Sequence, residues 1–224
     1  MSEISIRPYE PGDRAAVRRI CHETGFMGEP VDWLWRDVES FAELFTGWYT
    51  DHEPQSASVI DIDGQVKGYL LGCEDTARSA SEAIVFARQI VRRGILVRRG
   101  TAGTAWRMIG DGIVDVTVRR VDPRAAEVHD ARWPAHLHID LLPEARGLGL
   151  GRRLIQRWFA HLTAQGIPGC HLGTFAENTG AIAFFESVGF RRRTDAVAVP
   201  GFRTRDGARM HAQPMVVDLG SRPG

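Results

Sequence analysis

The sequence RGLGLGRR occupies residues 146–153 and joins a stretch with strand alternation to one with helical spacing. The stretch before it, HLHIDLL at 136–142, alternates polar and apolar residues and ends at Pro143. The stretch after it carries an apolar helical stripe at Leu154, Ile155, Trp158, Phe159 and Leu162. Backbone N–H groups at a helix start are unpaired, and the helix dipole is positive there. The glycine-rich turn is therefore predicted to hold a phosphate or pyrophosphate.

The spacing of the glycines excludes two common phosphate loops. A P-loop needs G-x-x-x-x-G-K-[ST], which is absent. The dinucleotide motif G-x-G-x-x-G fails because Arg152 stands where its third glycine belongs. Arg146, Arg152 and Arg153 nevertheless add positive charge at the turn. A plain helix start without a ligand is the alternative for this loop.

The loop and its surroundings resemble the GNAT superfamily of acyl-CoA-dependent N-acetyltransferases. Arg146-x-x-Gly149-x-Gly151 matches the family's [RQ]-x-x-G-x-[GA] loop. The segment NTGAIAFFESVGF at 178–190 is similar to the family's N-x-x-A-x-x-[FL]-[YF]-E-x-x-G-F pattern, and IRPYEPGDRAAV at 6–17 to its opening. The resemblance is tight over 134–192 and loose over 4–72. The sequence CHETGFMG at 21–28 adds a similarity to bacterial relatives of the acetyltransferase-like C-terminal domain of O-GlcNAcase.

The resemblance implies a mixed α/β fold with a splayed central sheet flanked by helices, and acetyl-CoA as co-substrate. In this family the strand before the loop pairs with the pantetheine arm, while loop N–H groups hold the pyrophosphate. Carried over position by position, the implied cofactor-binding residues are Leu141, Leu142, Arg146, Gly147, Leu148, Gly149, Leu150, Gly151, Arg152, Arg153, Asn178 and Phe185. Asn178 also suits the N-cap of a short helix, and the two roles are compatible.

Three titratable residues alternate along the strand that precedes the loop. His136, His138 and Asp140 point to one face, because successive side chains of a strand alternate. Amine acetylation requires a proton to leave R–NH3+, and imidazole is suited to accept it near neutral pH. We expect His138 to be the general base, with His136 and Asp140 as relay or orienting groups. Serotonin N-acetyltransferase of the same superfamily similarly carries paired histidines on this strand. Half-buried histidines with no catalytic role are the alternative.

A metal site is the weaker alternative for the two histidines. H-x-H on a strand binds metal in some hydrolases, but the remaining histidines show no ligand spacing. We therefore expect no metal and direct transfer in a ternary complex, without a covalent intermediate on the cysteines. The oxyanion is expected to meet a backbone N–H near Leu142.

The sequence departs from the family in one respect. Many members carry a tyrosine in the distal helix that protonates the leaving thiolate, whereas this chain has Phe184 and Phe185. The acid would then be Tyr49, Tyr69 or water. The same departure keeps open a catalytically silent acyl-CoA-binding or interaction domain.

Composition limits the class of protein. The 224 residues are 43% hydrophobic with 28 basic and 28 acidic side chains, so we expect one globular domain over 1–220. The balanced charge argues against nucleic acid or a membrane as partner. Residues 1–10 lack signal-peptide features, and three distant cysteines suit a reducing compartment, so a cytoplasmic location is expected. The acceptor is expected to be a small-molecule or peptide amine. A homodimer is compatible with the sequence, because a C-terminal strand can be exchanged.

The first part of the chain predicts a strand at 4–9 and a helix capped by Asp13. A second helix is expected over 32–47, ended by Gly47 and Pro54. Asp63-Gly64 between two apolar runs predicts a hairpin of strands 58–63 and 65–71. Later strands are expected at 170–175, from Phe190 and at 215–219.

Residues 75–130 lie outside the resemblance and read as a helical insertion. A helix is expected over 83–91 with an apolar stripe of Ile84, Ala87, Ile90 and Val91. Four arginines follow around Gly94, at 92, 93, 98 and 99. They are predicted to form a solvated helix end; the alternative is a local patch that binds phosphate or acidic groups.

Overall fold

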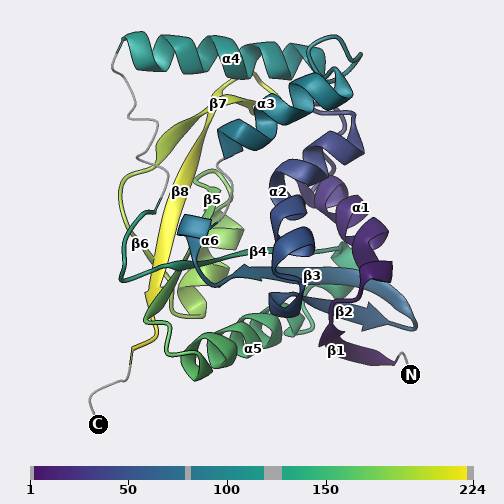
Figure 1. Ribbon diagram of the computed structural model, residues 1–224, viewed down its shortest axis with the longest axis vertical. Helices are drawn as coiled ribbons and strands as arrows, with labels where there is room; N and C mark the ends of the chain where they lie inside the picture. The colour runs from purple at the N-terminus through teal and green to yellow at the C-terminus, as the bar shows by residue number, and fades with distance from the viewer. Residues whose placement is uncertain (1–2, 79–81, 119–127, 221–224) are drawn as a thin grey trace.

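The computed structural model describes residues 3–78, 82–118 and 128–220. Figure 1 shows a central sheet with helices on both faces. The helices are α1 Arg14–Thr24, α2 Val38–His52, α3 Glu82–Arg93, α4 Ala102–Thr117, α5 Leu150–Ala164 and α6 Thr179–Ser187. The strands are β1 Ile4–Pro8, β2 Ser58–Ile62, β3 Gln65–Cys73, β4 Ala135–Leu141, β5 Gly169–Phe175, β6 Arg191–Arg192, β7 Val197–Arg203 and β8 Arg209–Asp218. The predicted mixed α/β class is confirmed.

The sheet has the order β1-β2-β3-β4-β5-β8-β6, and β7 pairs with β8. The β4–β5 pair is parallel, and the other pairs in the described chain are antiparallel. The predicted hairpin joins β2 to β3. Asp63 and Gly64 have φ of 53° and 78°, as a tight turn that follows the twist of the strands requires.

The sheet splays between β4 and β5. The two strands pair at Ala135 with Cys170 and at His136 with His171, and then they part. β4 stays paired with β3 as far as Leu141, while β5 stays paired with β8 as far as Phe175. The edge of β4 that faces β5 is therefore unpaired beyond His136, and a V-shaped opening lies at the centre of the sheet.

Two apolar cores lie on the two faces of the sheet. α1 and α2 cover one face and bury Ile20 and Phe41 with Tyr69 and Leu71 of β3. α5 covers the other face and buries Leu154, Ile155 and Trp158 with Leu137 of β4. Gly72 permits the close approach of α5, because a Cβ at this position would lie 2.4 Å from Trp158 Cη2.

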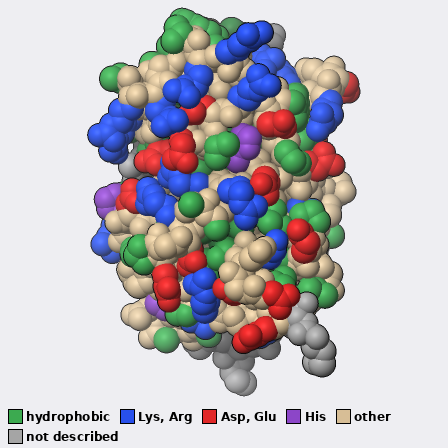
Figure 2. All heavy atoms as spheres, turned by 90° about the vertical axis from the view of Figure 1, so that its right-hand side faces the viewer, with side chains coloured by type: hydrophobic (Ala, Val, Ile, Leu, Met, Phe, Trp, Pro, Cys, Tyr) green, Lys and Arg blue, Asp and Glu red, His purple; other side chains and the backbone are tan. Residues whose placement is uncertain are grey.

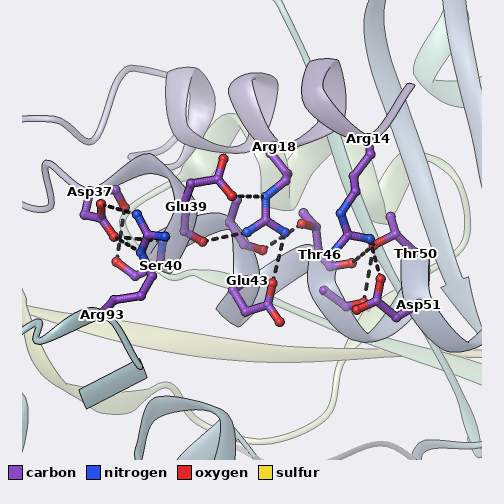
Figure 3. A network of polar contacts seen from close by, with 12 residues as sticks. Arg14, Arg18, Asp37, Glu39, Ser40, Glu43, Thr46, Thr50, Asp51 and Arg93 are labelled. Atoms are coloured by element: carbon purple, nitrogen blue, oxygen red, sulfur yellow. Dashed lines mark hydrogen bonds and ion pairs between the residues drawn. The ribbon is translucent and has the colours of Figure 1, made fainter. Parts of the chain in front are cut away.

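A polar network joins α1 to α2 (Figure 3). The buried Arg18 donates to Glu39 at 2.9 Å and to Glu43 at 3.0 Å. One positive charge on α1 is thus paired with two carboxylates of α2. At the start of α2 the Asp37 carboxylate accepts from Ser40 N and from both Arg93 and Arg98. Two of the four arginines around Gly94 thus fix the insertion to α2, which neither interpretation of that cluster anticipated.

The prediction for the second helix was wrong at both ends. Expected over 32–47, it runs Val38–His52, because Asp37 provides its N-cap and residues 31–35 form a turn instead. Gly47 lies inside the helix, at a buried position. Asp13 immediately precedes α1 as expected, but its carboxylate pairs with Arg7 and Glu10 N instead of capping that helix.

The insertion contains one predicted and one unpredicted helix, α3 and α4. The predicted apolar stripe of α3 was wrong in part, since Ile84 and Val91 are 65% and 85% exposed while Phe86 and Ile90 face the protein. The unpredicted α4 packs on the unpredicted β7, where Arg203 pairs with Asp111. Strand β8 also begins at Arg209, six residues before the expected Met215.

Candidate functional site

The glycine-rich turn presents a row of free amides. Gly147 and Gly149 have φ of 74° and 72°, and Gly149 is the N-cap of α5. The N–H groups of residues 147–152 have no hydrogen-bond partner in the described chain; the first paired amide is that of Arg153, to Gly149 O. Open space surrounds both left-handed glycines. The turn thus has the free donors and the room that a pyrophosphate requires.

The three arginines of the turn have different surroundings. Arg146 reaches back, with Nε 2.9 Å from Leu141 O and Nη2 2.7 Å from Gly28 O. Arg152 donates to the carbonyl and hydroxyl oxygens of Ser187 at the end of α6. Arg153 is exposed and has no charged partner in the described residues. Arg146 and Arg152 therefore brace the turn through neutral oxygens, and none of the three arginines has a carboxylate partner in the described residues. Leu148 is 52% exposed, whereas Leu150 is buried beneath the turn.

The end of β4 differs from the expectation in one detail. Leu141 lies on the unpaired edge, but the Leu142 N–H already donates to Lys67 O at 2.9 Å. The amide of Leu142 is thus not available to an oxyanion. Donors for that role have to come from the unpaired part of β4, between His136 and Leu141.

The two predicted contacts on α6 are placed differently. Asn178 caps the helix by accepting from Ala181 N at 3.1 Å, which leaves its side-chain N–H2 without a partner in the described chain. Phe185 is buried against Phe190, so it packs in the core. Phe184 faces the turn instead, because a Cβ on Gly151 would lie 3.2 Å from its ring.

A hydrogen-bonded group forms where β3 and β4 run side by side. Tyr69 lies opposite Asp140, and its hydroxyl donates to Asp140 Oδ2 at 2.6 Å. His138 Nδ1 is 3.4 Å from the same hydroxyl, and His138 Nε2 is 3.6 Å from Asp140 Oδ2. Phe45 of α2 stacks on the imidazole at 6.1 Å. The structure thus brings His138 and Asp140 together through a tyrosine.

Burial determines the ionisation of this group. It raises the pKa of the Asp140 carboxyl, although His138 and Tyr69 act in the opposite direction. Burial and the neighbouring Asp140 raise the pKa of Tyr69 well above its usual value, so the phenol keeps its proton. Burial likewise raises the pKa of the nearby Cys21 thiol, which suits neither a nucleophile nor a base.

His136 lies on the same face but has a separate environment. Burial, with smaller contributions from His171 and His138, lowers its pKa to about 3, so the ring is neutral. Thr76 Oγ1 donates to Pro134 O and lies 2.9 Å from His136 Nδ1, which makes Nδ1 the protonated nitrogen. A ring that resists protonation is unsuited to store a proton, and this limits His136 to an orienting role.

Sequence reasoning named Tyr69 only as one alternative acid and did not anticipate Phe45. The contact between Tyr69 and Asp140 depends on the register of two strands that are 71 residues apart, which no local pattern reveals. No cluster of three or more metal-ligating side chains occurs in residues 3–78, 82–118 and 128–220. Nor is any helix among them long and apolar enough to cross a membrane.

A splayed mixed sheet with an amide-lined turn at its opening defines the GNAT fold, the fold of acetyl-CoA-dependent acetyltransferases. The model of the acetyltransferase (GNAT) family matches residues 116–190, which include β4, the turn, α5, β5 and α6. The match covers about a third of the chain, so the fold and this segment are similar to those of the GNAT acetyltransferases. Acetyl-CoA is the acyl donor of that class.

Individual relatives agree with this class. Mycothiol acetyltransferase from Streptomyces scabiei is 24% identical over 196 residues, which are 83% of this chain and 58% of the relative. The chain thus spans little more than half the length of that protein. The solved structure of SsHAT is 28% identical, with a TM-score of 0.65 over 98% of this chain and 100% of that one. A putative acetyltransferase from Salmonella typhimurium, solved with acetyl-CoA, shares the fold at 17% identity, with a TM-score of 0.56 over 99% and 96% of the two chains.

Proposed function

We propose that this protein transfers an acetyl group from acetyl-CoA to a primary amine by direct attack in a ternary complex. The observation that carries the proposal is the adjacency of three features: the free amides of 147–152, the unpaired edge of β4, and the group formed by Tyr69, Asp140 and His138 on that same strand. The first two suit the diphosphate and the pantetheine arm. The third is a proton acceptor next to the position of the thioester.

His138 and Asp140 act as one proton-accepting unit in this proposal. The ammonium group of the acceptor loses one proton to His138, and the neutral nitrogen then attacks the carbonyl carbon of the thioester. The second proton leaves the nitrogen for water as the C–S bond breaks, which gives the amide. Asp140, 3.6 Å from His138 Nε2, stabilises the imidazolium that results. Tyr69 holds the carboxylate in place with its 2.6 Å hydrogen bond.

The proton for the leaving thiolate comes from the same imidazolium through water. Tyr69 is excluded as the acid, because its proton is already donated to Asp140 and its pKa is raised. This transfer returns the imidazole to the neutral form that the next acceptor requires. A tyrosine on α6 is then unnecessary, which accounts for Phe184 and Phe185.

The acceptor is proposed to be a small molecule or peptide that carries a free amine. The similarity to the mycothiol acetyltransferase of Streptomyces scabiei extends over most of the chain and favours a small-molecule acceptor. Phe45 and the exposed edge of Trp33 offer apolar surface on the α1–α2 side, from which an acceptor would approach.

One observation favours a second function, a silent acyl-CoA-binding domain. The two phenylalanines remove the hydroxyl that many family members use. Such a domain would bind acetyl-CoA and never release free CoA.

The test is thiol release from acetyl-CoA with a panel of small amines and amino-terminal peptides. Acceptor-dependent release that His138→Ala abolishes and His161→Ala leaves intact supports the proposal. His161 is a suitable control, because it pairs with Glu74 outside the site. Binding of acetyl-CoA without release under any acceptor would establish the silent domain instead.

A further inference from the structure

We propose that α3, the turn at 94–100 and the first half of α4 form a docking surface for an anionic phospholipid bilayer. This stretch has an unusual composition for a chain of zero net charge. Between Glu82 and Asp111 there are six arginines and no acidic residue. The overall charge balance predicts no broad electrostatic footprint, but a local one is compatible with it.

The structure shows which of these arginines are free. Arg93 and Arg98 pair with Asp37, and Arg107 donates to Thr104 Oγ1. Arg88, Arg92 and Arg99 are exposed, and no carboxylate of the described chain pairs with them. Three basic groups are thus available to phosphate headgroups in the described chain, while two others hold the segment onto α2. Figure 3 shows the contact of Arg93 with Asp37.

Aliphatic side chains protrude among the free arginines. Ile84, Val91 and Val97 are 65%, 85% and 87% exposed, and Ile84 and Val91 share a helix face with Arg88 at spacings of three and four. Trp106 is 57% exposed, while its indole N–H donates internally to Leu96 O. An aromatic ring whose polar atom is already paired can enter the interfacial region of a bilayer without losing a hydrogen bond.

The shape and charge favour lipid over protein. α3 and α4 lie at one end of the long axis of the molecule in Figure 1, and basic and hydrophobic side chains predominate at that end in Figure 2. Side chains exposed by more than 80% protrude from the surface and do not line a groove, which suits insertion between headgroups. A second copy would bring like charges together, so self-association through this face is disfavoured.

The test is sedimentation of the full chain with vesicles of phosphatidylcholine alone or of phosphatidylcholine with phosphatidylglycerol. We expect binding to the anionic vesicles, weakened by salt, and little binding to the neutral ones. Each of Arg88→Gln, Arg92→Gln and Arg99→Gln should weaken binding about fivefold. The double variant Val91→Ser with Val97→Ser should bind the anionic vesicles more weakly, and salt should abolish the binding that remains.

Arg157→Gln is the matched control, because Arg157 is an exposed arginine on α5 with no carboxylate partner in the described residues. It should bind as the unaltered protein does. Circular dichroism and the thermal shift with acetyl-CoA should be unchanged in all variants, which keeps the test separate from the proposed acetyl transfer. Equal sedimentation with both vesicle types would overturn the proposal. So would full binding by a variant that combines the three substitutions Arg88→Gln, Arg92→Gln and Arg99→Gln. Arginine-dependent binding to soluble polyglutamate without vesicle binding would identify an acidic protein surface as the partner instead.

Discussion

At the scale of single residues, the proposed acetyl transfer depends on how β3 and β4 bring three polar side chains together. His138 and Asp140 come from one strand and Tyr69 from its neighbour. Burial raises the pKa of Asp140, and the tyrosine hydrogen bond opposes that rise. The pKa of Asp140 thus depends on two opposing effects, and one substitution can change it.

Tyr69→Phe removes the donor to Asp140 and keeps the ring. Without that bond the pKa of Asp140 should rise further, so the acid limb of kcat/KM should move to higher pH. We expect kcat to fall about tenfold. The KM for acetyl-CoA should stay constant, because Tyr69 lies away from the glycine-rich turn. A pH–rate profile that coincides with that of the unaltered protein would contradict the positioning role.

His136 predicts a pH dependence of stability. Its pKa is about 3 in the folded protein, below the ordinary value of about 6.5 for an unfolded chain. The unfolded state therefore binds the extra proton, and stability present above pH 6.5 is lost as the pH falls toward 3. Between pH 6 and 4, we expect the free energy of unfolding to fall more steeply in the unaltered protein than in His136→Gln. The difference between the two slopes should be about 1 kcal/mol per pH unit.

Denaturant unfolding at pH 6, 5 and 4 measures this difference in slope. His171, whose pKa is also lowered by burial, faces His136 and contributes the same sign in both proteins. The difference in slope between the unaltered protein and His136→Gln therefore reports the contribution of His136 alone. Parallel slopes would mean that the ring is protonated in the folded state.

At the scale of elements, short-range signals predicted best. The glycine-rich turn before α5, the Asp63-Gly64 hairpin and the Asn178 cap of α6 each depend on a few adjacent residues, and each occurs where expected. In each case the residue type itself indicates the local conformation: glycine permits a positive φ, and asparagine supplies a side-chain acceptor at the start of a helix. The conformation of the turn, the hairpin and the cap could be predicted for this reason.

Elements that depend on distant partners were missed. α2 begins at residue 38 and not at 32, because Asp37 is held by two arginines that lie 56 and 61 residues away. β7 and α4 support one another through Asp111 and Arg203, which are 92 residues apart. The meeting of Tyr69 with Asp140 is of the same kind. Local periodicity contains no information on such pairs.

Asp37→Ala tests the junction between α2 and the insertion. Burial raises the pKa of Asp37, but hydrogen bonds from Arg93 and Ser40 outweigh burial and bring it to about 2. Loss of the cap and of two partly exposed ion pairs should destabilise the protein by about 2 kcal/mol. Asp37→Asn keeps the cap, so it should cost about half as much. Chemical denaturation checks both values; equal losses would show that the cap contributes nothing.

Gly149→Ala tests the turn itself. Open space surrounds this glycine, so the added methyl group meets no clash, but its φ of 72° is unfavourable for alanine. A destabilisation of about 1 kcal/mol and weaker acetyl-CoA binding should follow. Gly173→Ala is the control, because that glycine also has open space and its φ is not left-handed. Thermal shift with and without acetyl-CoA separates the two effects.

At the scale of the whole molecule, the two faces of the sheet carry different parts of the candidate site. One face, under α5, supports the turn that is proposed to receive the diphosphate, and the other, under α1 and α2, carries the proposed proton-accepting group. The opening between β4 and β5 connects the two. The insertion adds an arginine-rich end that is fixed to α2 by Asp37. The proposed membrane contact thus lies on a part of the fold separate from the proposed acetyl-transfer site, and the two can be altered independently.

The central claim is that the free amides of residues 147–152 hold the diphosphate of acetyl-CoA. Isothermal titration with acetyl-CoA and with acetyl-pantetheine, which lacks the diphosphate and nucleotide, tests it most directly. We predict saturable heat with acetyl-CoA and an affinity at least about tenfold weaker for acetyl-pantetheine, a difference of about 1.4 kcal/mol or more. Equal affinity for the two, or no heat with acetyl-CoA, would contradict the account.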